Sequence, residues 1–343
     1  MAQLTHAALS AAAGGSIIRE DVMDQIWLLQ YEQLPFSDII GRGTHSNRKA
    51  EFVVDELAAA STSNAAVEGA DVTQNNTKIP ARLGNYTQIA VKGVRISDTA
   101  ESADSVGGAG SMSRQIQLRQ KELRQDVESQ MMSEQASVAG DAATIAGISA
   151  GFGAQVKTNI SLGATGVAGG FNTTTGLFVS PTPGTKRALS EKIVRDILQQ
   201  IYIGGGKTTK LMGRPQVIRL MSEYLFTGTA RVATLTSQKN QGSSPDAMTA
   251  YGSVNVFVTD FGQTVELRDN PFQPTEAAAQ SALYFLDPQY IQQSLMRGYQ
   301  VEPLAKTGLA DNKMMSVQYS LKVLQEKNQG CIYAIDEALA MVA

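Results

Sequence analysis

The best-spaced catalytic pattern in the chain is Gly147-Ile148-Ser149-Ala150-Gly151, which matches the G-x-S-x-G turn that holds the nucleophile of many serine hydrolases. That chemistry needs a strand before the serine, and an acid and a histidine after it. The only histidines, His6 and His45, both precede Ser149, and no strand is predicted in front of the serine. The pattern therefore favours a loop of small residues, and a serine hydrolase using Ser149 is kept only as an alternative.

A second motif, Gly206-Lys207-Thr208, resembles the end of a phosphate-binding loop. Ile201 stands where that loop needs its first glycine, and a helix is predicted where the loop needs a preceding strand. A glycine helix stop followed by a solvated lysine explains the same residues without any ligand.

Metal-binding residue types are scarce in this sequence. His6, His45 and the single cysteine, Cys331, offer no spacing that would place three ligands around one ion. Cys331 falls in a predicted strand, where a buried and inert thiol is usual. We therefore expect no catalytic, cofactor-binding or metal-binding residue and no cofactor, and we predict that the protein is not an enzyme.

The composition limits the remaining function classes. The chain has 343 residues, too many for one ordinary core, so two or three lobes are expected. Its net charge of -3 and its 18% of charged residues argue against a dedicated nucleic-acid binder and suit large uncharged subunit contacts. The 6% of aromatic residues predicts mainly aliphatic cores. The start of the chain lacks the pattern of a secretory signal, and no run of 18 apolar residues predicts a membrane span.

The elements that would position any site begin with an extended N-terminal part. Residues 1–15 are small and polar and read as an arm. Residues 18–34 have helical periodicity, and Pro35 ends that segment. Trp27 and Phe36 are interpreted as anchors of the arm.

The next stretch predicts a long β-arm. Residues 51–57 and 87–97 read as two strands at its base, and a phase change at Lys92–Gly93 suggests a β-bulge. Residues 58–85 between them contain few large apolar groups and cannot bury a core of their own. So long a loop is uncommon inside a compact domain, and we expect a neighbouring molecule to support it.

A helix over 112–139 is the longest predicted element. Its apolar stripe is narrow, so the helix should lie on a sheet with its polar face in water. Ser111 or Ser113 would cap it, and Arg124 and Glu128 would form an i,i+4 pair. The stripe consists of Ile116, Leu123, Val127, Met131 and Val138.

The remaining residues predict short helices and antiparallel strands. Residues 140–188 read as loops with short strands, followed by an amphipathic helix at 189–203, a strand at 210–212 and a helix from Pro215 to Leu225. Strands at 253–259 and 264–268 form a predicted hairpin, and a strand at 315–323 is predicted to turn at 328–330 into a second hairpin with 331–335. The class is α+β.

Five segments carry a resemblance to a known family. They are QLPFSDIIGRGTHSNRKAEFVVDEL (33–57), VRISDTAESADSVG (94–107), VFVTDFGQTVELRDNPF (256–272), LDPQYI (286–291) and LAKTGLADNKMMSVQYSLKVLQEKNQGCI (304–332). Together they resemble the major head proteins of certain elongated-head podoviruses, a tailed-bacteriophage family with the Hong Kong 97-type capsid fold. The resemblance runs in order over residues 18–336, and Phe52 stands where an aromatic residue, often tryptophan, is usual.

The resemblance implies a division of the chain. Residues 1–49 would be the N-terminal arm, 50–97 the extended E-loop hairpin, and 98–145 a linker and the long spine helix of the peripheral domain. Residues 146–250 would form mainly the axial domain, and 251–343 would supply axial and peripheral strands that return to the peripheral domain.

The resemblance also implies a function. The chain would be a major capsid protein that self-assembles into hexamers and pentamers and forms the DNA-containing head of the virion, built in the host cytoplasm. Its partners would be copies of itself, a separate scaffold protein, a portal at one vertex and a decoration protein, with only weak non-specific contact to packaged DNA and none to membranes. A separate scaffold is expected because no long, charged helical segment precedes the arm. The alternatives are a bacterial nanocompartment shell protein and a phage head-decoration protein.

Overall fold

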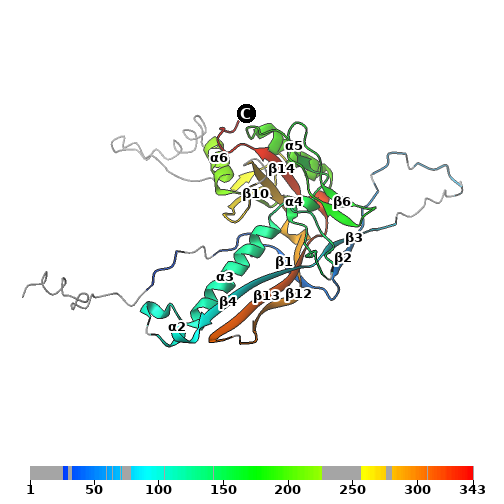
Figure 1. The fold of residues 1–343 in the computed structure, drawn as a ribbon. Helices are drawn as coiled ribbons and strands as arrows, with labels where there is room; N and C mark the ends of the chain where they lie inside the picture. Colours follow the sequence, from blue (N-terminus) through cyan, green and yellow to red (C-terminus); the bar gives the residue numbers. More distant parts are fainter. Residues whose placement is uncertain are drawn as a thin grey trace, which may run out of the picture.

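A computed structural model of the chain describes residues 26–29, 33–58, 60–63, 65–69, 71, 79–103, 105–141, 143–225, 256–275, 280–306 and 308–342. Two sheets, each with its own helices, lie one above the other in Figure 1, and a hairpin arm leaves the body between them. The α+β class predicted from the sequence is therefore confirmed. Most of the helix predicted at 18–34 lies outside the described residues, and Ile26–Leu29 within it are not helical.

The lower sheet has four strands in the order β1-β12-β13-β4. Its strands are β1 (Gly41–Thr44), β4 (Gln88–Ser97), β12 (Ile291–Pro303) and β13 (Ala310–Val323). β1 pairs with β12 in parallel, and the other neighbours are antiparallel. The long helix α3 (Met112–Met131) runs beside β4, while α2 (Asp98–Ser102) and the short 3-10 helix η1 (Val106–Gly108) connect the two (Figure 1).

The upper sheet has six strands in the order β5-β14-β11-β8-β10-β9. They are β5 (Ile160–Ser161), β14 (Gly330–Ile335), β11 (Ser281–Leu286), β8 (Lys210–Gly213), β10 (Thr264–Asp269) and β9 (Val256–Val258). Helices α5 (Glu191–Ile203) and α6 (Pro215–Leu225) pack on this sheet, and their buried residues share its core. Both helices and the β9–β10 hairpin match the predicted segments, because each is set by local periodicity, a proline start or a glycine stop.

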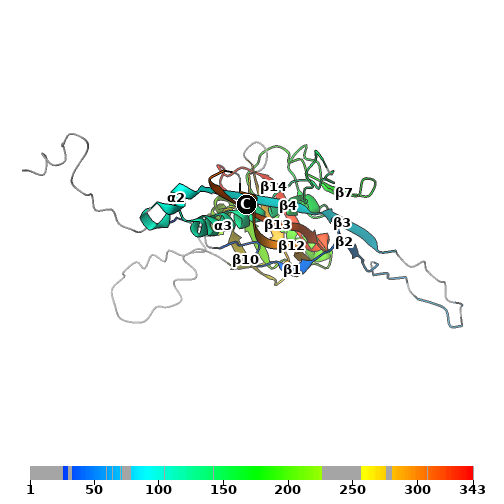
Figure 2. The same ribbon diagram turned by 60° about the horizontal axis from the view of Figure 1, so that its bottom comes forward.

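Several short elements complete the fold. A two-stranded hairpin joins β2 (Lys49–Val54) to β3 (Ala81–Tyr86), and a second joins β6 (Gly170–Asn172) to β7 (Leu177–Val179). The single-turn helices are α4 (Phe152–Gln155), η3 (Pro288–Tyr290) and η4 (Glu326–Asn328). Figure 2, turned from the first view, also shows β2 and β3 leaving the body, so the hairpin projects in both views.

The cores are mainly aliphatic, as the composition predicts, and aromatic side chains gather at one place in the larger core. Phe152 is fully buried and lies edge-on to Phe36 and Tyr284, with ring centroids 6.1 and 5.1 Å apart. Tyr333 and Tyr319 are buried in the same cluster. Five aromatic side chains therefore share the core where the N-terminal segment, α4 and both sheets meet.

The predicted base of the β-arm is wrong in its pairing. β2 pairs with β3 and not with residues 87–97, which instead form β4 against β13. The predicted bulge at Lys92–Gly93 is also absent, since β4 keeps one register from Gln88 to Ser97. Ile89 and Val91 lie on the exposed face of the strand, so the apparent phase change came from exposed apolar residues. Register shifts occur instead in the pairing of β12 with β13, on both sides of Arg297.

The long helix ends eight residues before its predicted end, at Met131 and not at 139. The Ser133 hydroxyl donates to the carbonyl of Gln130 and accepts from the Gln135 amide, at 2.7 and 3.3 Å. Such side-chain bonds compete with helical ones. Val138 then forms a bridge with Ile148 and leaves the helical stripe. Ser111 occupies the N-cap position as predicted, without a side-chain capping bond.

The predicted hairpin of 315–323 with 331–335 is wrong, because its two strands belong to different sheets. β13 pairs with β12 and β4, whereas β14 pairs with β11 and β5. The residues between them cross from one sheet to the other. The Asn159 side chain fixes this crossing by donating to the carbonyls of Lys327 and Gln329, at 2.7 and 3.0 Å.

Candidate assembly surfaces

Ser149 is a buried structural residue. Its hydroxyl accepts hydrogen bonds from the Asn85 side chain at 3.1 Å and from the Leu321 amide at 3.2 Å. Through Ser149, these bonds join the end of β3 to β13. His45, the one histidine in the described part of the chain, does not bond to Ser149, because its two ring nitrogens bind the hydroxyls of Ser294 and Thr87. The arrangement gives Ser149 a packing role, and its hydrogen-bond partners among the described residues include no base that could activate it.

His45 fixes the chain where the N-terminal segment meets the lower sheet. Its Nδ1 lies 2.9 Å from the Ser294 hydroxyl and its Nε2 lies 2.7 Å from that of Thr87. Burial, and secondly the positive charge of Lys322, lower the pKa of His45 below its ordinary value. Both shifts favour the neutral imidazole, which links β12 to the residue between β3 and β4.

The other predicted motifs are structural as well. Gly206 follows α5, and a side chain there would lie 2.8 Å from Ile201, so the glycine serves close packing at a helix end. Cys331 is fully buried in β14. Among the described residues, no group of three potential ligands could hold a metal ion. Within the same residues, no helix has the length and apolar content to cross a membrane.

Glu128 is a buried, hydrogen-bonded carboxylate that the sequence analysis did not single out. It is completely buried on α3, and its carboxylate accepts bonds from the Phe36 amide at 2.6 Å and the Ser37 amide at 2.9 Å. The Ser37 hydroxyl and the Asn270 side chain also donate to it, the latter at 2.9 Å. The predicted pair with Arg124 is replaced, because the Arg124 guanidinium lies over the Tyr299 ring at 5.4 Å.

The Glu128 bonds connect three separate parts of the molecule. Phe36 and Ser37 belong to the N-terminal segment, and Glu128 belongs to the long helix. Asn270 directly follows β10 of the upper sheet. Burial raises the pKa of Glu128 above its ordinary value, although the four donors act in the opposite direction. The sequence signal that could have identified Glu128 is its position beside Val127, within the apolar face of the helix.

The base of the projecting arm is held by ion pairs. Arg82 on β3 pairs with Glu51 on β2, and Lys327 reaches Glu56 at 2.7 Å. The hydrogen bond from Arg82 lowers the pKa of the Glu51 carboxyl. These pairs tie the base to its own chain.

Beyond that base, the described residues of the arm expose large apolar side chains to solvent. Leu57 is 99% exposed and Ile79 is 87% exposed, and Val67 is similarly open. Isolated exposed apolar residues are ordinary, but three along one projecting segment make the arm a candidate contact surface.

The N-terminal segment presents a second exposed surface. Phe36 is fully buried, which confirms its role as an anchor, but Trp27 is 79% exposed, so the same prediction for Trp27 is wrong. Leu28 and Leu29 are exposed beside it. The segment is attached at Phe36 and leaves its aromatic end open.

Two sequence comparisons relate this chain to capsid proteins. A family model described as SU10 major capsid protein matches residues 4–336. The major capsid protein of Escherichia phage Phieco32 is 24% identical over 328 residues, which cover 87% of this chain and 88% of that protein.

Solved structures show the same fold. The capsid of a native GTA particle has a TM-score of 0.57 at 13% identity, covering 98% of this chain and 100% of its own. The SrpI encapsulin complex of Synechococcus elongatus PCC 7942 has a TM-score of 0.50 at 11% identity, covering 100% of this chain and 99% of its own. At these identities the likeness concerns the fold alone.

Proposed function

The chain belongs to the SU10 major capsid protein family and is a capsid-forming shell protein, and on this premise we propose that its copies form the hexamers and pentamers of a DNA-containing phage head. The observation that supports this finer statement is the projecting hairpin β2–β3, whose exposed apolar tip has no partner in the described part of its own chain. Ordering such a segment costs conformational entropy that contacts with another subunit would offset.

We also propose the Hong Kong 97-type division of the chain, with revised boundaries. The N-terminal arm ends near residue 48, and the E-loop is the β2–β3 hairpin with its tip, so it ends at Tyr86. The peripheral domain is the four-stranded sheet with α3, and the axial domain is the six-stranded sheet with α5 and α6. Strands β11 and β14 then belong to the axial domain, and β12 and β13 to the peripheral domain.

The alternative of a nanocompartment shell has one observation in its favour, the full-length likeness to the SrpI encapsulin fold. A head-decoration protein has no comparable support. We prefer a phage head because the family that covers residues 4–336 is a phage capsid family. A separate scaffold, a portal, a decoration protein and weak non-specific contact with DNA complete the proposed set of partners, with assembly in the host cytoplasm.

The experiment is expression of the chain with and without the candidate scaffold gene, followed by sedimentation and negative-stain electron microscopy. We expect closed shells with hexameric and pentameric units, at higher yield with the scaffold. Particles from infected cells should contain DNA, whereas a nanocompartment would contain protein cargo. A chain that stays a soluble monomer at high concentration, with the scaffold present, would contradict the proposal.

A further inference from the structure

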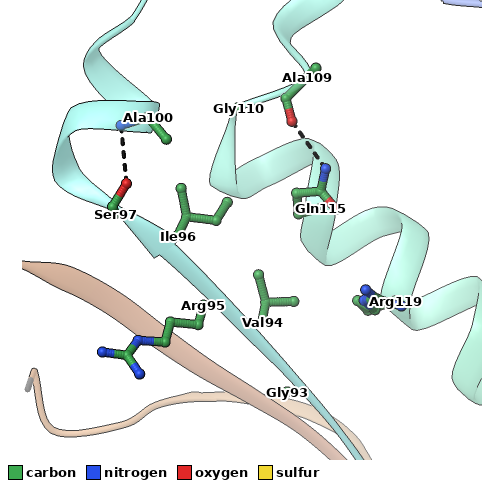
Figure 3. A pocket seen from close by; sticks show the side chains of 10 residues that line it. All are labelled: Gly93, Val94, Arg95, Ile96, Ser97, Ala100, Ala109, Gly110, Gln115 and Arg119. Carbon is green, nitrogen blue, oxygen red and sulfur yellow. Dashed lines mark hydrogen bonds between the residues drawn. The ribbon is translucent and has the colours of Figure 1, made fainter.

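A groove lies between the end of β4 and the start of α3. It has a volume of about 440 Å³, within the size range of sites that accept a bulky group. Figure 3 shows Val94 and Ile96 pointing from the strand toward the helix, while Gln115 and Arg119 line the opposite wall and Arg95 points away. Val94 is 8% exposed, so the groove has an apolar floor. Gln115 is occupied by a bond of 3.0 Å to the Ala109 carbonyl.

The chain's only tryptophan, Trp27, does not line this groove, although the residue before it packs on the turn that leads into the lining residues Ala109 and Gly110. Ile26, its neighbour, is seated against η1, where a side chain on Gly107 would come within 2.7 Å of the Ile26 Cγ1. Gly107 also has a left-handed φ of 59°, so the turn that receives Ile26 favours glycine on both counts. Trp27 nevertheless remains exposed and is not among the residues that line the groove.

Within the described residues, the exposed Trp27 side chain and a groove that it does not line thus occur on the same subunit. Two different patches that fit each other produce a heterologous contact, which generates a closed ring when the rotation between neighbours closes and an open filament when it does not. The indole would rest on Val94 and Ile96 and lie near the Arg119 guanidinium, and such cation–π contacts favour tryptophan. Arg119 is held in place by its pair with Glu122 at 2.6 Å.

We propose that Trp27 of one subunit docks in the Val94–Arg119 groove of a second copy of this chain. This inference rests on the proposed self-assembly and adds a specific contact to it. In this contact the exposed end of the N-terminal segment binds the groove of the neighbouring subunit.

The first test uses the single tryptophan as its own reporter. Acrylamide quenching of Trp27 fluorescence should fall several-fold when dilute subunits assemble into shells, and the emission should shift to the blue. Leu309→Ala is the matched control, because Leu309 is as exposed as Trp27 but lies outside the groove. That variant should show the same protection of Trp27. Shells in which Trp27 is quenched as readily as in dilute subunits would overturn the inference and leave the proposed function intact.

The second test separates docking between subunits from docking within one. A donor chain keeps Trp27 and carries Ala100→Leu, which fills the groove from an exposed position on α2; an acceptor chain keeps the groove and carries Trp27→Ala. Trp27 should be protected in mixed assemblies and remain open to quenching in the donor alone. Equal protection in the donor alone would refute the groove as its site. Unchanged thermal midpoints of the dilute variants check that both chains fold. If the wild-type chain forms no shells at all, both the proposed function and this contact are contradicted.

Discussion

At the scale of single residues, Glu128 joins the N-terminal segment, the long helix and the upper sheet through its buried hydrogen bonds. We expect Glu128→Gln to lower the free energy of unfolding by about 1–3 kcal/mol, because the amide cannot accept from the Phe36 and Ser37 amides and the Asn270 side chain together. Urea unfolding of the unassembled subunit measures the change. Glu122→Gln is the control, since its partly exposed pairs with Lys92 and Arg119 should be worth less than about 1 kcal/mol. Equal losses from the two variants would contradict a special role for Glu128.

The pH dependence of this residue follows from the direction of its shift. Burial raises the pKa of Glu128 above 4.5, so the folded state holds its proton more tightly than the unfolded state does. Its contribution to stability is then fully present below the unfolded pKa and is lost as the pH rises through the folded one. The advantage of the wild type over Glu128→Gln in thermal midpoint should be largest in acid and shrink above about pH 4.5. An advantage that grows with pH would show that the four donors outweigh burial.

Cys331 is expected to have no chemical role. It is fully buried in β14, so it cannot reach another subunit without local unfolding. Cys331→Ser should leave particle yield nearly unchanged and cost about 1–3 kcal/mol of subunit stability if the new hydroxyl lacks a partner. Yield after sucrose-gradient sedimentation tests this, and covalent oligomers on non-reducing gels that vanish in the variant would contradict it.

At the scale of the elements, α3 is held by its narrow apolar face. Leu123→Ala should cost about 2–5 kcal/mol of unfolding free energy, because Leu123 is buried between the helix and the lower sheet. Gln117→Ala, on the exposed face of the same helix, should change stability by less than about 0.5 kcal/mol. Chemical denaturation of the two variants side by side measures the difference, and similar losses would mean that the buried face is assigned wrongly.

The elements that could be predicted are those whose signals are local. The periodicity of α5, the proline at the start of α6 and the alternation along β13 all correspond to observed elements. Pairing between distant strands was not predictable, because nothing within residues 315–335 shows that β13 and β14 enter different sheets. The same limit hid Glu128, whose partners lie about 90 residues before it and 142 residues after it in the chain. The i,i+4 spacing predicted Arg124 as the partner of Glu128, because only nearby residues can be paired from the sequence.

At the scale of the whole molecule, the projecting arm separates folding from assembly. Replacing residues 57–79 with Gly-Asn-Gly keeps the β2–β3 pairing and the Glu56–Lys327 ion pair, so the subunit should fold with little change in thermal midpoint. The variant loses the exposed Leu57 and Ile79, whose burial on a neighbour would stabilise the shell. We therefore expect fragile shells or none when it is co-expressed with the scaffold.

A matched variant shows whether the apolar side chains or the length of the arm matter. Leu57→Ser with Ile79→Ser keeps the full arm and removes two of its apolar contacts, so it should assemble but dissociate at lower temperature than the wild type. Because these contacts are apolar, shell stability should depend less on salt than exposed ion pairs would require. Light scattering during heating, at low and high salt, measures both effects. Normal, heat-stable shells from the shortened arm would exclude an inter-subunit role for it, whereas an insoluble chain would place residues 57–79 in the subunit's own core.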